Sequence, residues 1–239
     1  MYLSNIIMVL TMNTHFIQAA GDLYLLLNRG YPKRPAVKLV GDRYRLDGIH
    51  RMILYRGIFD RRQAETRRAK LSVDPRRKKC RVDGYNILFS IRNYLMGRPL
   101  FVANDGFLRD SGGPLRTPGS PEKLEQSLQS LIRFLQFLRP REFTLYLDLS
   151  VPGCQNHTTV LDQKIRQAGL AGSVEPVPSA DRTIGETKEG IAVTSDSEII
   201  DRLLVPATDL LGHLRNQARP REHPLFSRPI QDLGEFLPG

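Results

Sequence analysis

From Cys80 onward, short apolar runs alternate with longer segments in which apolar residues recur at helical spacing. The run from Phe143 to Leu149 is almost continuously apolar, as expected for a strand that is covered on both faces of a parallel sheet. Strands that alternate with helices in this way favour an α/β fold with right-handed crossovers. We therefore predict a three-layer α/β/α parallel sheet over residues 80–216.

One part of this region departs from the alternation. Leu100-Phe101-Val102 and Phe107-Leu108 flank Asn104-Asp105-Gly106, which is a strong turn signal. We predict a hairpin over residues 99–110, with Asp105 as a turn residue.

The segment before the predicted sheet has the periodicity of helices. Apolar residues at helical spacing, from Ile17 to Leu27, are followed by Gly30 and Pro32, which predict the end of a helix. Further helices are expected over 36–40, 46–54 and 61–70, and Asp74-Pro75 breaks the last of them. We place a basic helical domain at 1–79 and a Pro-rich, loosely packed tail at 217–239. The apolar residues 1–12 are too short to cross a bilayer and make a poor signal peptide.

The positive charge of the chain is unevenly distributed. Residues 1–80 contain 17 Lys and Arg against 6 Asp and Glu, whereas residues 81–239 contain 18 against 19. Such an excess indicates a polyanionic partner, most often nucleic acid, although a solvated helix face would produce the same count. The run Arg76-Arg77-Lys78-Lys79 is the candidate phosphate-binding segment, or a solvated linker.

Carboxylates follow the predicted strands. Asp83 ends the first strand, Asp148 lies near the end of the second, and Asp181 and Asp196 follow the third and fourth. Because the carboxyl ends of parallel strands meet at one edge of the sheet, we expect these side chains to lie together. Gathered carboxylates repel one another unless a cation lies between them, and Mg²⁺ or Mn²⁺ prefers such oxygen ligands.

A second interpretation of each acid is local. An aspartate at the end of a strand often caps the helix that follows, and both Asp83 before Asn86 and Asp196 before Ser197 are suited to this role. For the four acids together we favour a metal site that orients a water for phosphodiester cleavage. Asn86, one turn after Asp83, would position a phosphate or a water.

The motifs Val82-Asp83-Gly84-Tyr85-Asn86, Tyr146-Leu147-Asp148 and Val193-Thr194-Ser195-Asp196-Ser197-Glu198 resemble the PIN-like superfamily, especially its NYN branch. The whole chain also resembles an uncharacterised prokaryotic family that joins a small helical domain to such a domain. The resemblance implies a Rossmann-like sheet, an Mg²⁺ or Mn²⁺ centre and ribonuclease activity. It implies that Asp83, Asp181 and Asp196 are the metal-binding acids, with Asn86 as a polar companion and Glu198 or Asp201 as the last acid.

We therefore expect a metal-dependent nuclease with its site at Asp83, Asn86, Asp148, Asp181, Asp196 and Glu198. RNA is the expected substrate, with DNA as a second possibility. The alternatives are a non-catalytic nucleic-acid-binding module on the same fold and a regulatory protein-interaction protein. The two cysteines, Cys80 and Cys154, form no disulfide framework, which fits a cytoplasmic protein. No membrane association is expected.

Overall fold

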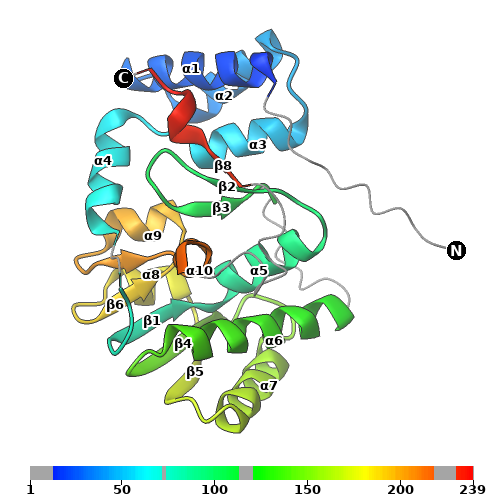
Figure 1. Cartoon of the computed structure of the whole chain (residues 1–239), viewed down its shortest axis with the longest axis vertical. Helices are drawn as coiled ribbons and strands as arrows, with labels where there is room; N and C mark the ends of the chain where they lie inside the picture. Colours follow the sequence, from blue (N-terminus) through cyan, green and yellow to red (C-terminus); the bar gives the residue numbers. More distant parts are fainter. Residues whose placement is uncertain (1–12, 72–73, 113–120, 218–229, 239) are drawn as a thin grey trace, which may run out of the picture. The chain divides into compact units, whose positions relative to one another are not determined.

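The computed structural model describes residues 13–71, 74–112, 121–217 and 230–238 (Figure 1). The chain forms two compact units that are interleaved along the sequence. Unit 1 contains residues 1–69, 93–113 and 220–239, and unit 2 contains residues 70–92 and 114–219. The expected domains at 1–79, 80–216 and 217–239 stay a prediction. The chain passes from one compact unit to the other several times, and no shift in composition marks these positions.

Unit 2 is an α/β unit around a parallel sheet. Its elements are β1 (Lys79–Asp83), α5 (Gly84–Leu95), α6 (Pro121–Leu138), β4 (Glu142–Asp148), α7 (Cys154–Gln167), β5 (Gly172–Val177), α8 (Ala180–Gly185), β6 (Ile191–Val193), α9 (Ser197–Arg202), β7 (Ala207–Thr208) and α10 (Leu210–Gln217). The strand order is β5-β4-β1-β6-β7, and every pairing in this sheet is parallel. The predicted α/β class is confirmed.

The core of unit 2 lies where helices cover the sheet. Val82 of β1 and Leu145 and Leu147 of β4 have no exposed surface, and neither do Leu131 and Leu135 of α6. Helices α6 and α7 run beside each other next to β4 and β5 (Figure 1). Five successive residues of β4 are buried, so both faces of this strand are covered. This explains why the sequence of β4 is apolar at successive positions rather than alternating.

Local chemistry sets two boundaries in unit 2. Strand β7 (Ala207–Thr208) begins directly after Pro206, which has no N–H to give to a strand ladder. Helix α7 begins at Cys154, directly after Gly153, whose φ is +81°. None of the described helices is long and apolar enough to cross a bilayer.

In its described residues, unit 1 combines helices with a small sheet. Its elements are α1 (Thr14–Asn28), α2 (Lys33–Arg43), α3 (Gly48–Gly57), α4 (Arg61–Lys70, whose last residue belongs to unit 2), β2 (Leu100–Val102), β3 (Leu108–Asp110), β8 (Gln231–Asp232) and the 3₁₀ helix η2 (Leu233–Phe236). Phe16, Leu23 and Ile53 are fully buried with Phe101 of the hairpin and Leu233 of η2. The core of unit 1 therefore needs residues from three distant parts of the chain.

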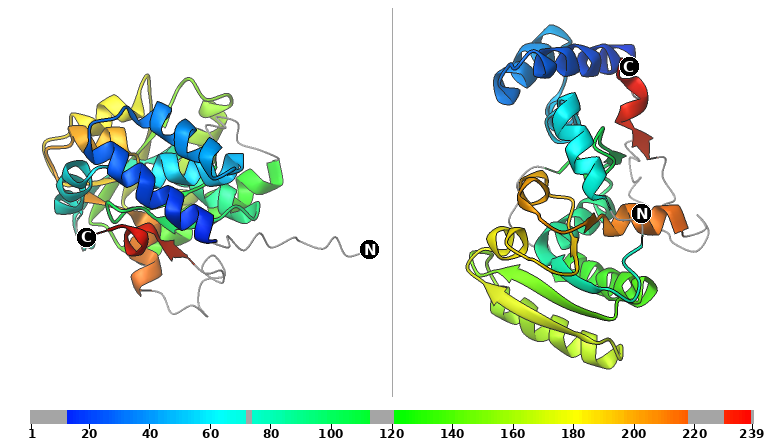
Figure 2. Two further views of the ribbon diagram at one scale, coloured as in Figure 1. Left: turned by 90° about the horizontal axis from the view of Figure 1, so that it is seen from above. Right: turned by 90° about the vertical axis from the view of Figure 1, so that its left-hand side faces the viewer.

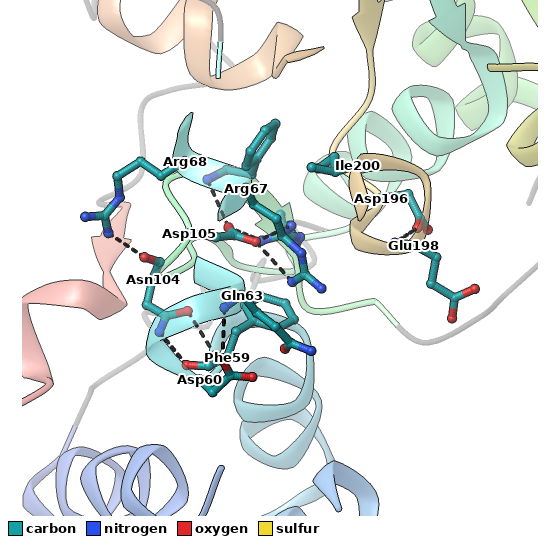
Figure 3. A network of polar contacts seen from close by, with 12 residues as sticks. Phe59, Asp60, Gln63, Arg67, Arg68, Asn104, Asp105, Asp196, Glu198 and Ile200 are labelled. Carbon is teal, nitrogen blue, oxygen red and sulfur yellow. Dashed lines mark hydrogen bonds and ion pairs between the residues drawn. The ribbon is translucent and has the colours of Figure 1, made fainter. Parts of the chain in front are cut away.

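The predicted hairpin is confirmed, because β2 and β3 pair in antiparallel fashion. Its turn residues form hydrogen bonds and ion pairs with the segment that contains α3 and α4. The Asn104 side chain accepts a hydrogen bond from the Phe59 N–H (3.0 Å) and donates one to the Phe59 carbonyl (2.8 Å), as Figure 3 shows. Asp105 has no exposed surface and pairs with Arg109 (2.6 Å) and Arg67 (3.4 Å). The turn can therefore be buried, because protein groups satisfy its polar side chains where a surface turn would contact water.

The expectation of a loosely packed tail is wrong for the end of the chain. Residues 230–238 form β8, which pairs in parallel with β2, and η2, which contacts α1 (Figure 2). Leu233 is fully buried there. One buried leucine and two strand residues are too few to produce a periodic pattern, so these elements could not be predicted from the sequence. Residues 218–229 lie outside the described residues.

Candidate metal centre at the carboxyl edge of the unit 2 sheet

The strand order of unit 2 defines a place where ligands bind in open α/β sheets. The first strand of this sheet along the chain is the central strand β1. The chain then adds β4 and β5 on one side of β1 and crosses to add β6 and β7 on the other side. The direction of winding therefore reverses between β1 and β6. The carboxyl ends of the two strands at such a reversal leave a crevice, because their connections turn away from each other.

Asp83 is the last residue of β1 and lies at this reversal. It is only 4% exposed, and its carboxylate accepts a hydrogen bond from the Thr194 hydroxyl, which follows β6, at 2.9 Å. Burial raises the pKa of Asp83, and the negative charges of Asp196 and Asp181 raise it further, to about 8. Asp83 is therefore mostly uncharged at neutral pH when no cation is nearby.

Two hydroxyl residues connect the loop after β6 to the end of β1. The Thr194 hydroxyl donates to Asp83 and accepts from the Asp196 N–H at 3.0 Å. The Ser195 N–H and hydroxyl both donate to the side-chain oxygen of Asn86, at 3.3 and 3.0 Å. The sequence showed these hydroxyls beside Asp196, but their partners lie more than a hundred residues away, so the pairing could not be predicted.

Asp196 caps helix α9. Its carboxylate accepts hydrogen bonds from the backbone N–H groups of Glu198 (2.8 Å) and Ile199 (3.4 Å), and Figure 3 shows it beside the exposed Glu198. The capping interpretation of Asp196 is thus confirmed. For Asp83 the equivalent bond from the Asn86 N–H is long, at 3.4 Å, so the cap contributes little there.

Asp148 and Asp181 complete the acidic edge from the neighbouring strands. One Asp148 carboxylate oxygen accepts from the Ala180 N–H at 3.1 Å, which ties β4 to the start of α8. Asp181 is exposed in the first turn of α8. Although the residue is exposed, its carboxylate is partly desolvated by nearby protein atoms, which raises the pKa of Asp181, and the charges of Asp196, Asp148 and Glu198 raise it further. The acids expected at one edge are therefore close enough to repel one another.

The donor set has the chemistry of a site for a hard divalent cation, because it consists of carboxylate oxygens beside hydroxyl and amide oxygens. Among the residues that the structure describes, however, no group of three or more His, Cys, Asp or Glu side chains converges as a metal site. Asp181 and Glu198 are exposed, so their side chains have room to change rotamer. The edge provides suitable ligands rather than a preformed cage.

A buried Tyr–His pair lies beside the acidic edge and was missed from the sequence. The Tyr85 hydroxyl, in the first turn of α5, is 2.8 Å from Nδ1 of His157 on α7, and both side chains are buried. Burial raises the pKa of Tyr85 and lowers that of His157, so the pair is uncharged at neutral pH. Tyr85 and His157 are 72 residues apart in the chain, so no local sequence pattern joins them.

The basic run lies at the other end of the sheet. Lys79 begins β1 and Asp83 ends it, so roughly 13 Å of strand separates them. Arg76 pairs with Asp74 (2.9 Å), and Lys79 pairs with Glu142 (3.0 Å) and Glu189 (3.3 Å). The structure therefore does not bring Arg76, Arg77, Lys78 and Lys79 into the acidic edge.

Comparison with known proteins identifies two sequence families of unassigned role. Residues 74–211 match the family described as "Domain of unknown function (DUF5616)", and residues 15–70 match "Protein of unknown function (DUF434)". The chain is 26% identical over 185 residues to "Uncharacterized protein MJ0935" of Methanocaldococcus jannaschii, which covers 77% of this chain and 88% of that protein. No solved structure matches the chain.

Proposed function

The chain belongs to the DUF5616 family through residues 74–211, and from this premise we propose that unit 2 is a divalent-metal-dependent nuclease that acts on RNA. The family description assigns no chemistry, so the support comes from the site. The observation that carries the proposal is the Asp83 carboxyl, buried at the winding reversal with its pKa raised to about 8 by burial and by Asp196 and Asp181. We further propose that the sheet is of the PIN-like type.

Electrostatics supports this choice over a purely structural role. The charges of Asp196 and Asp181 oppose the ionisation of Asp83, and the charges of Asp196, Asp148 and Glu198 oppose the ionisation of Asp181. Ionising both carboxyls therefore destabilises the folded protein unless a cation compensates the added negative charge. When bound, Mg²⁺ or Mn²⁺ would ionise a water and stabilise the leaving oxygen of a phosphodiester. Asp83, Asp181 and Asp196 are the residues that would hold it.

The polar side chains around the acids have separate roles in the proposal. Ser195 engages the side-chain oxygen of Asn86, so Asn86 presents its amide nitrogen, which is a donor suited to a phosphate oxygen. Thr194 holds the Asp83 carboxylate in one orientation. Buried Asp83 is thereby fixed, whereas exposed Asp181 and Glu198 are placed to adjust to a substrate.

A second candidate function rests on a specific observation. The carboxylates of Asp196 and Asp148 already accept backbone N–H groups, and no three acids of the described residues converge as a metal site. Both facts fit a nucleic-acid-binding module on the same fold that makes no use of a metal. Such a protein would bind RNA without cleaving it, and would bind equally well after the acids are replaced.

The experiment compares cleavage of a fluorescent mixed-sequence RNA, with Mn²⁺ present, by the wild type and by Asp83→Asn combined with Asp196→Asn. We expect cleavage by the wild type and only background with the double variant. Asp162→Asn combined with Glu175→Gln removes the same charge from α7 and β5 and is expected to leave cleavage unchanged.

A metal titration separates the two candidate functions. Mn²⁺ should raise the melting temperature of the wild type and of the Asp162/Glu175 control, and should leave the Asp83/Asp196 variant unchanged, because ligand binding to the folded state stabilises it. Equal cleavage by the wild type and the Asp83/Asp196 variant, or no thermal response to Mn²⁺ in the wild type, would rule out the nuclease.

A further inference from the structure

Cationic side chains from two separate loops meet at the amino-terminal edge of the unit 2 sheet. We use "cationic rim" for Arg76, Arg77, Lys78, Arg139 and Arg141, all of which are exposed. The first three precede β1 and the other two precede its parallel neighbour β4. The loops are joined by backbone hydrogen bonds from the Arg77 N–H to the Arg139 carbonyl and from the Arg141 N–H to the Lys78 carbonyl, both 3.0 Å.

The backbone of the cationic rim is strained at two arginines. Arg77 has a φ of +58° and Arg139 a φ of +49°, in the left-handed region that glycine occupies at little cost. A residue with a Cβ is less stable than glycine in this region, because its Cβ approaches the neighbouring carbonyl oxygen. Stability alone would favour glycine at both positions. Arginine, and not glycine, occupies both of these strained positions, which points to a use for the two side chains.

The charge of these loops is only partly neutralised. Residues 74–79 and 139–142 together contain six Lys and Arg and two Asp and Glu. Within the described part of the chain, the ion pairs at this edge are those of Arg76 with Asp74, of Lys79 with Glu142 and Glu189, and of Arg81 with Glu189. A positive potential therefore remains around the other exposed members of the rim.

We propose that the cationic rim binds the phosphodiester backbone of a nucleic-acid strand through charge and hydrogen bonds, without reading its bases. Guanidinium groups suit phosphate oxygens because they donate paired N–H bonds in a fixed geometry. The rim lies at the opposite end of β1 from Asp83, so one phosphate cannot reach both. Binding here is consequently independent of the proposed metal chemistry and should persist in EDTA.

The strained backbone allows a test that removes charge without endangering the fold. Arg77→Gly combined with Arg139→Gly removes two cations at positions where glycine is the less strained residue. Arg77→Lys combined with Arg139→Lys keeps the charge. Arg133→Gln combined with Arg166→Gln removes two exposed cations from α6 and α7 that are not members of the rim. All variants are first compared in melting temperature, and the glycine variant should melt no lower than the wild type.

Binding is measured by fluorescence anisotropy in EDTA, with a labelled single-stranded RNA and a DNA of the same sequence, over a series of salt concentrations. Two lost phosphate contacts should reduce the slope of log Kd against log salt by about 1.4 and weaken binding about tenfold or more at 100 mM NaCl. The lysine variant and the Arg133/Arg166 control should keep the wild-type slope. Equal binding of RNA and DNA identifies the shared backbone, and a preference for RNA identifies an added 2′-hydroxyl contact.

The proposal is overturned if the wild type binds neither strand in EDTA, or if the glycine variant keeps the wild-type affinity and salt slope. It is also overturned if the Arg133/Arg166 control weakens binding as much as the glycine variant, because the effect would then follow net charge and not the rim. Loss of cleavage by the acid variants leaves these measurements unaffected, so the failure of either proposal can be recognised separately.

Discussion

At the scale of single residues, the acids of unit 2 combine local and collective roles. Asp196 caps α9 and also raises the pKa of Asp83. Asp148 accepts from the start of α8 and also raises the pKa of Asp181. A cap and a metal ligand both use a carboxylate at the end of a strand, so the two interpretations of these residues were never exclusive.

Asp83 gives a pH-dependent prediction. Its folded-state pKa, about 8, exceeds the ordinary value of 3.8. The contribution of Asp83 to stability is therefore fully present below about pH 4 and is lost as the pH rises through 8. Asp83→Asn, which stays neutral, should therefore raise the free energy of unfolding by about 1–3 kcal/mol at pH 8.5 and by much less at pH 5.

Urea unfolding in EDTA at the two pH values measures this difference. Glu175→Gln, an exposed acid of the same sheet, is the control and should show no such dependence. A gain for Asp83→Asn that is the same at pH 5 and pH 8.5 would contradict the assigned pKa.

The sequence predicted residue positions better than residue partners. Asp83 and Asp148 could be placed because apolar runs end at them. Asp105 was expected in a turn and does lie there, where it accepts from the Phe107 N–H. Its pairing with Arg67 could not be predicted, because Arg67 belongs to a helix and lies 38 residues earlier in the chain.

At the scale of elements, the connection from β1 to α5 fixes the candidate site. Gly84 follows Asp83 directly, and a Cβ at this position would come within 2.7 Å of the Leu147 side chain and 2.9 Å of the Tyr146 carbonyl oxygen. The close approach of α5 to β4 therefore depends on the absence of a side chain. This approach also determines where Asn86 meets Ser195.

Gly84→Ala should lower the free energy of unfolding by about 1–3 kcal/mol, because β4 must shift to admit the methyl group. Gly21→Ala is the matched control, since nothing lies within 4 Å of its Cβ position and it sits inside α1. That substitution should raise stability by about 0.5–1 kcal/mol through helix propensity. Chemical unfolding of both variants checks the pair; a neutral Gly84→Ala would show that the packing against β4 is looser than described.

Elements with a local signature were predicted, whereas those defined by distant pairing were displaced or missed. Helix α1 ends at Asn28, before the Gly30 and Pro32 that predicted its end. The hairpin was found from its turn residues. The short strands β7 and β8 owe their existence to pairing with β6 and β2, which no window of the sequence contains.

At the scale of the whole molecule, each of the two interleaved units has its own core. We therefore expect a substitution in one core to destabilise that unit and to leave the other unchanged. Leu233 is fully buried in the unit 1 core, and Gly57 of α3 lies so close that a Cβ there would meet the Leu233 side chain. Leu233→Ala should therefore destabilise unit 1 by about 2–4 kcal/mol through the lost burial and the remaining cavity.

Hydrogen exchange read by mass spectrometry locates the effect. In Leu233→Ala, amides of residues 14–69 and 100–110 should exchange faster, whereas those of β1, β4 and β5 should keep their wild-type protection. Leu204→Ala, at an 83% exposed position, is the control and should change neither set. Faster exchange confined to residues 230–238 would show that the end of the chain is not part of the unit 1 core.

The burial of Leu233 beside Phe16 also bears on how the protein is made. A ribosome releases helices α1 to α4 before the strands of unit 2, but Leu233, which closes the core around these helices, leaves it after those strands. The strands of the unit 2 sheet have all emerged once Thr208 has left the ribosome. The nascent chain can therefore fold this sheet before the core of unit 1 is complete. Helices α1 to α4 must therefore keep an open apolar face until Leu233 has been synthesised.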